Sequence, residues 1–112
     1  MNDTSMYQRR WQRDAHQALG EFLTADDLPA VTWTIAISGA LVADVDSLTS
    51  TPDEQRAAFE AWARHLDAKV IPERTDSSGA VRLYAQFSWQ GDRVRGAIRC
   101  SIYPPMDDEA QS

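Results

Sequence analysis

The sequence predicts an α+β fold, a two-layer sandwich in which two helices cover one face of a four-stranded, mainly antiparallel sheet. Apolar residues recur every three or four positions in two stretches, as in helices with one buried face. Each of these stretches is followed by two segments in which apolar and polar residues alternate, as in strands. The chain has 112 residues, 43% of them hydrophobic, which suits one core and one domain over residues 1–103.

The first predicted helix covers residues 7–23. Thr4 or Ser5 is expected to cap its first turn, and Pro29 prevents its continuation. The expected buried stripe consists of Tyr7, Trp11, Ala15, Ala18, Leu19, Phe22 and Leu23.

A hairpin is predicted over residues 31–47. Its first strand alternates Val31, Trp33, Ile35 and Ile37 with smaller or polar residues, and a three-residue loop at 38–40 brings all apolar residues to one face. The pairs expected from this loop length are Ile37 with Leu41, Ile35 with Ala43, and Trp33 with Val45.

The second predicted helix begins after Thr51, which is followed by Pro52 and by Glu54, a combination typical of a capping box. Its expected buried stripe is Ala58, Phe59, Trp62, Ala63 and Leu66. The segment from Pro72 to Gly79 is polar and rich in turn residues, and it predicts a surface connection without regular structure.

A second hairpin is predicted from strands at 81–89 and 93–102, joined by a tight turn at Gln90 and Gly91. This turn predicts that Phe87 pairs with Val94, Leu83 with Ile98, and Val81 with Cys100. It also places Arg82 opposite Arg99, a destabilising pair that needs compensation. Residues 104–112 are expected to form an acidic, mobile tail.

The order of elements is a circular permutation of the ferredoxin-like pattern, which by analogy gives the sheet order 3-4-2-1. That order places the strand bearing Asp44 beside the strand bearing Arg99. The outer face of the sheet, away from the helices, is then a candidate platform for a partner, because Arg and Tyr are frequent in binding hot spots. The candidate partner-binding residues are Thr32, Thr34, Asp44, Arg82, Tyr84, Gln86, Arg95 and Arg99.

Charge and composition limit the partners. The net charge of -6 disfavours general binding to nucleic acid or anionic lipid. The single cysteine, Cys100, lies in an apolar alternation and forms no intrachain disulfide, which fits a reducing compartment. No apolar run approaches the roughly 20 residues of a membrane helix, and the polar start lacks the apolar stretch of a signal peptide. We therefore expect a cytoplasmic protein.

Motifs for catalysis or cofactor binding are absent from the sequence. His16 and His65 fall on different helices without neighbouring ligands at metal-binding spacing, and the isolated glycines form no phosphate loop. Cys100 is expected to face inward without an activating neighbour. We expect no enzyme activity and no cofactor.

Several short runs resemble small uncharacterised proteins common in GC-rich Gram-positive bacteria. The runs are residues 28–35, with the sequence LPAVTWTI, together with GAL at 39–41, FEAW at 59–62 and PERT at 72–75. This family has no established activity, so the resemblance implies no functional residues. It favours a binding role over chemistry.

The leading expectation is a non-enzymatic accessory protein that contacts another protein through the outer sheet face or an edge strand, as a homodimer. One alternative is a small-molecule or anion binder that uses the space between helices and sheet, or Arg82 and Arg99 as a clamp. Another is an acidic mimic of nucleic acid that blocks a basic partner.

Overall fold

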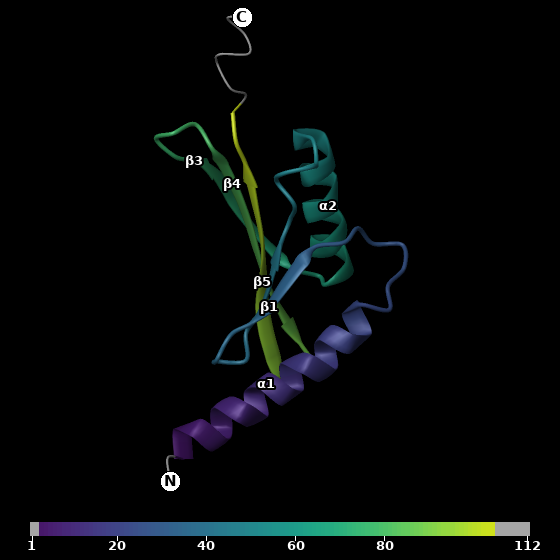
Figure 1. Cartoon of the computed structure of the whole chain (residues 1–112), viewed down its shortest axis with the longest axis vertical. Coiled ribbons are helices and arrows are strands. Elements are labelled where there is room, and N and C mark those ends of the chain that lie inside the picture. Colours follow the sequence, from purple (N-terminus) through teal and green to yellow (C-terminus); the bar gives the residue numbers. More distant parts are fainter. Residues whose placement is uncertain (1–2, 105–112) are drawn as a thin grey trace, which may run out of the picture.

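The computed structural model describes residues 3–104 and contains two helices and one five-stranded sheet (Figure 1). The sheet order is β1-β2-β5-β4-β3; β2 and β5 are parallel, and the other neighbours are antiparallel. The elements are α1 (Asp3–Phe22), β1 (Thr32–Ile35), β2 (Leu41–Asp44), α2 (Pro52–His65), β3 (Lys69–Thr75), β4 (Val81–Trp89) and β5 (Val94–Ile102).

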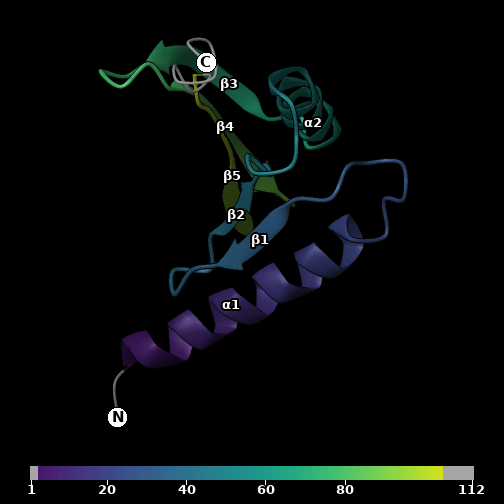
Figure 2. The same ribbon diagram turned by 45° about the horizontal axis from the view of Figure 1, so that its top comes forward.

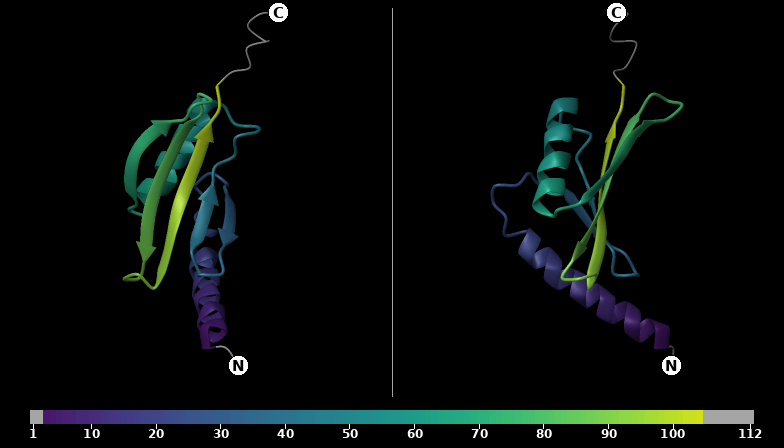
Figure 3. Two further views of the ribbon diagram at one scale, coloured as in Figure 1. Left: turned by 90° about the vertical axis from the view of Figure 1, so that its left-hand side faces the viewer. Right: turned by 180° about the vertical axis from the view of Figure 1, so that it is seen from behind.

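The core lies between the helices and one face of the sheet, so the α+β class and the two helices are as predicted. Phe22 of α1 packs near Phe87 and Trp89, and Trp62 of α2 packs near Trp33. The two helices cover different parts of the sheet: α2 runs alongside the strands, whereas α1 crosses the end where β4 meets β5 (Figures 2 and 3). Among residues 3–104, no helix lies on the opposite face of the sheet.

The fifth strand, β3, corrects the prediction of four strands. Residues 72–75, expected to be an irregular connection, continue a strand that begins at Lys69 and pairs with β4. Pairing satisfies the edge N–H and C=O groups of β4, which outweighs a weak local signal. A register shift between Ile71 and Arg74 accommodates Pro72, which has no N–H to donate. The four predicted strands follow one another in the predicted order, but the ferredoxin-like permutation is not confirmed.

The predicted register of the first hairpin is wrong by two residues. Trp33 pairs with Ala43 and Ile35 with Leu41. The loop therefore has five residues, closed by the Ala36 N–H donating to the Ala40 carbonyl at 2.9 Å. Ile37, expected to face the core, lies in this loop and is 64% exposed. A shift of two residues keeps each remaining side chain on its predicted face.

The second hairpin is also displaced by two residues. Its turn has four residues, in which Gln90, Gly91 and Asp92 all have positive φ, and Val81 pairs with Ile102. The other inward pairs are Leu83 with Cys100, Ala85 with Ile98, and Phe87 with Gly96. The predicted pairing of Arg82 with Arg99 across the two strands is consequently wrong. Arg82 lies opposite Ser101, and Arg99 lies opposite Tyr84.

The start of α2 is as predicted. The Thr51 hydroxyl accepts from the Glu54 N–H at 3.2 Å, and the Glu54 carboxylate accepts from the Thr51 N–H at 2.8 Å. The expected stripe of α2 is buried, and the Trp62 indole N–H donates to the Pro29 carbonyl at 2.7 Å. Gln55 was not expected in the core; it is buried and donates to the Ser101 carbonyl at 2.8 Å.

The predictions for α1 are only partly confirmed. The helix includes Asp3, so Thr4 and Ser5 lie within it and do not cap it. Ala15, Ala18 and Phe22 are buried, whereas Leu23, Tyr7 and Trp11 are exposed. The N-terminal half of α1, which carries Tyr7 and Trp11, extends past the end of the sheet (Figure 1). The predicted acidic tail at 104–112, apart from Pro104, lies outside the described residues.

Candidate interaction face

The outer face of the sheet gathers most of the residues predicted to bind a partner. One row of Cα partners crosses all five strands, and three of its members are Asp44, Arg99 and Tyr84 in the centre. The complete row is Thr32, Asp44, Arg99, Tyr84 and Ile71. The next row contains Thr34, Val42, Ala97, Gln86 and Lys69. Seven of the eight predicted residues therefore lie in these two rows or the row beside them, where Arg82 pairs with Ser101.

Asp44 and Arg99 form an ion pair between the parallel strands β2 and β5. The Arg99 Nε and Nη2 atoms each donate to a different carboxylate oxygen of Asp44, both at 3.0 Å. The hydrogen bonding with Asp44 raises the pKa of Arg99. Two parallel hydrogen bonds fix the plane of the guanidinium group, so the Arg99 side chain has a defined orientation beside Tyr84.

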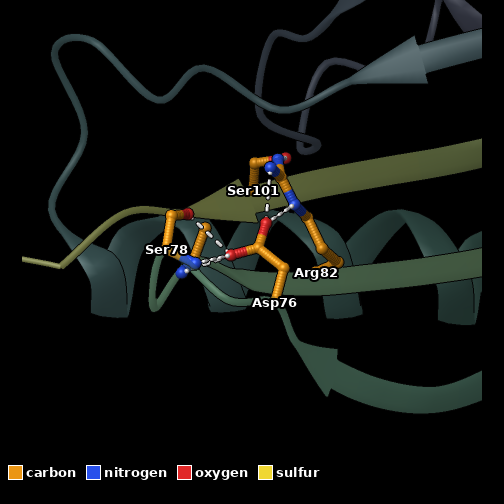
Figure 4. Close-up of polar contacts among 5 residues, drawn as sticks. Asp76, Ser78, Arg82 and Ser101 are labelled. Carbon is orange, nitrogen blue, oxygen red and sulfur yellow. Dashed lines mark hydrogen bonds and ion pairs between the residues drawn. The ribbon is translucent and has the colours of Figure 1, made fainter.

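A second cluster holds Arg82 at the other end of the face (Figure 4). Asp76 accepts from Arg82 Nε at 3.1 Å and from Nη2 at 2.8 Å, and Arg82 Nη1 donates to the Ser101 hydroxyl at 2.6 Å. Hydrogen bonds from Ser78 and Arg82 lower the pKa of Asp76 to about 2. The Arg82 guanidinium also lies 5.5 Å from the ring centre of Tyr103, a cation–π contact.

The structure adds residues that the sequence interpretation missed. Arg74 and Ile71 of β3 border a shallow hollow of about 570 Å³ together with Arg82, Tyr84 and Arg99. Arg74 was missed because residues 72–79 were interpreted as a surface connection, although the two β-branched residues before Pro72, Val70 and Ile71, favour a strand. Arg95 lies apart, opposite Ser88 and 3.7 Å from Asp92, so it does not join the hollow.

Both arginines of the predicted clamp are paired with carboxylates, whereas Lys69 and Arg74 on the same face make no ion pair within residues 3–104. Arg82 and Arg99 each hold a carboxylate, and both pairs are partly exposed. An anion held by Arg82 and Arg99 would have to displace Asp76 or Asp44, or bind a guanidinium group whose charge is already compensated. The clamp that the sequence suggested is therefore occupied by the protein's own carboxylates.

A separate apolar groove lies on the inner face, between α2 and β3. Its volume is about 570 Å³. Val70 in the groove is 56% exposed. The residues that line the groove are seven apolar ones, Phe59, Ala63, Ala68, Val70, Ile71, Pro72 and Leu83, and five charged ones, Arg56, Glu60, Arg64, Asp67 and Glu73.

The other candidate residues are placed as follows. His16 and His65 are exposed on different helices. Cys100 is buried, and this burial raises the pKa of its thiol to about 11. Within residues 3–104, no group of three or more His, Cys, Asp or Glu side chains is arranged to hold a metal ion. In the same part of the chain, neither helix is long and apolar enough to span a bilayer.

Comparison with known proteins gave no match to a family model, a curated protein or a solved structure.

Proposed function

We propose that this chain is a non-enzymatic accessory protein of the cytoplasm that binds another protein through the outer face of its sheet. The observation that carries the proposal is the held arrangement on this face: Arg82 and Arg99 are fixed by carboxylates, and Tyr84 lies exposed between them. Preorganised Arg and Tyr side chains lose little conformational entropy on binding, which favours their use as anchors.

The face is a better candidate than the sheet edges. Pro72 and the irregular register interrupt β3, and both features discourage the addition of another strand. The opposite edge, β1, has only four residues, Thr32–Ile35. A partner that bound through backbone pairing would therefore find a short ladder at either edge. The pairing of Arg82 and Arg99 with carboxylates also favours a protein surface over a strongly charged polymer.

Crosslinking tests this proposal in cells that naturally produce the chain. A photoreactive benzoylphenylalanine replaces Tyr84 or Gln86 on the outer face, and in a control it replaces the exposed Ala57 of α2. We expect an adduct of one defined mass from both outer-face positions and none from position 57. Adducts that are absent at 84 and 86, or equal at all three positions, would contradict the proposal.

An exchange of charges distinguishes specific binding through the outer face from non-specific adsorption. The double variant Asp44→Arg/Arg99→Asp keeps the net charge and allows the same ion pair in reverse, while it inverts the pattern offered to a partner. We expect this variant to retain its thermal stability and to lose the adduct at position 84. Retention of the adduct in the exchanged variant would exclude a role for this row of residues.

A further inference from the structure

The N-terminal half of α1 carries apolar side chains that are exposed, although the backbone and Cβ of Trp11 lie against Gly39. Met6 is 58%, Tyr7 51% and Trp11 42% exposed. The rings of Tyr7 and Trp11 are stacked with centroids 6.2 Å apart. Apolar residues on a surface helix normally face the core. Here the sheet ends before them, so this side of α1 requires another explanation (Figure 1).

We infer that the N-terminal half of α1 inserts into the groove between α2 and β3 of a second copy of this chain. This inference concerns the other side of the molecule and is independent of the outer-face proposal. The groove has the complementary property, because its exposed Val70 also lacks a covering element. A helix that lays its apolar side into an apolar groove is a common mode of protein recognition.

The N-terminal half of α1 and the groove along α2 have similar lengths. Residues 3–13 of α1 make about 16 Å of helix at the usual rise of 1.5 Å per residue. The groove follows α2 from Arg56 to Arg64, which corresponds to about 13 Å by the same rule. The same copy cannot satisfy itself, because α1 is one continuous helix whose C-terminal half is fixed to the sheet by Ala18 and Phe22.

Charge favours the groove over a pairing of two α1 helices. Residues 3–13 contain three arginines and one acidic residue, Asp3, in a chain whose net charge is -6. Two such helices side by side would bring like charges together. The groove lining instead carries three carboxylates and two arginines, a net charge of -1; Arg56 pairs with Glu73, whereas Glu60 and Asp67 make no ion pair within residues 3–104. A second copy therefore meets carboxylates at the groove and arginines at α1.

A two-fold axis allows both contacts at once. Each copy then supplies one α1 half and one groove, which gives a closed dimer with two identical contacts. Because the contacts are between different surfaces, damage to either surface weakens both contacts in a homodimer. A mixture of copies damaged at different surfaces still forms one intact contact.

Sedimentation of purified protein over a range of concentrations provides the test. We use Tyr7→Glu for the helix, Val70→Glu for the groove, and Leu48→Glu as a matched control, since Leu48 is an exposed apolar residue outside both surfaces. We expect wild type and Leu48→Glu to dimerise alike. Each of the other variants should raise the dissociation constant at least about tenfold, since a buried carboxylate lacks a partner there. Thermal melting checks that every variant is folded.

Mixing separates helix-to-groove contact from the alternatives. Tyr7→Glu protein carries an intact groove, and Val70→Glu protein carries an intact helix, so an equal mixture with different mass labels should yield a heterodimer. A monomeric wild type would overturn the inference. In that case the groove would bind a small molecule or another protein, and not a second copy. A Val70→Glu protein that still dimerises, or a mixture without heterodimer, would overturn it as well.

Discussion

Gly39 in the loop between β1 and β2 lies directly against Trp11 of α1. A Cβ atom at Gly39 would be 2.5 Å from the Trp11 Cβ and 2.8 Å from the Trp11 carbonyl oxygen. Gly39 also has φ of 84°, a conformation that side chains disfavour. The contact places the loop against the middle of α1, where the Gln12 amide also donates to the Ala36 carbonyl at 3.4 Å.

Replacement of this glycine should be destabilising for two reasons. We expect Gly39→Ala to lower the free energy of unfolding by more than about 2 kcal/mol, from the strained φ and the collision with Trp11. Gly20→Ala is the matched control, since Gly20 lies in α1 with no atom within 4 Å of the added group. It should stabilise by roughly 0.5–1 kcal/mol. Urea unfolding of both variants measures this, and equal effects would contradict the close contact.

The capping box of α2 gives a second prediction. Thr51→Ala removes the acceptor for the Glu54 N–H and should lower the free energy of unfolding by about 1 kcal/mol. Thr51→Ser keeps a hydroxyl in the same place and should restore most of that loss. Urea unfolding compares the three proteins. A serine variant as unstable as the alanine variant would indicate that the methyl group matters and the cap does not.

The Asp76 cluster predicts a pH dependence of stability. The pKa of Asp76 is lowered to about 2 in the folded protein, so its contribution is complete above its ordinary pKa of 3.8 and is lost as the pH falls toward 2. Asp76→Asn should therefore melt at a lower temperature than wild type at pH 7, and the gap should narrow between pH 4 and pH 2. The exposed Asp27 provides the control Asp27→Asn. A gap independent of pH would exclude this role of Asp76.

Cys100 gives a prediction of reactivity. Burial raises the pKa of its thiol to about 11, so the folded protein should resist a disulfide reagent at pH 8 and react only after unfolding in urea. Ser77→Cys places a thiol in the exposed turn and should react rapidly in the folded state. The unfolded thiol ionises at lower pH than the folded one, so stability should fall as the pH rises from 9 toward 11. Fast labelling of native Cys100 would contradict its burial.

Much of the fold could be predicted from local patterns. Alternation assigned Leu83, Ala85 and Phe87 to the inner face and Tyr84 to the outer face, and the sequence around Thr51 marked the start of α2. The outer-face residues were found by the same alternation. Arg74 was missed because the tendency of β3 to form a strand comes from pairing with β4, and a short segment with Pro72 carries little of that signal.

By itself the sequence determined which side of each ribbon is buried, because successive side chains of a strand point to opposite faces wherever the strand is placed. Only the tertiary structure decided the two hairpin registers, the fifth strand and the exposure of Tyr7 and Trp11. A shift of two residues leaves the alternation unchanged, so the choice between registers came from the loops and their contacts. Likewise, an apolar stripe on a helix does not predict where the sheet beneath it ends, so the exposure of Tyr7 and Trp11 could not be read from the sequence.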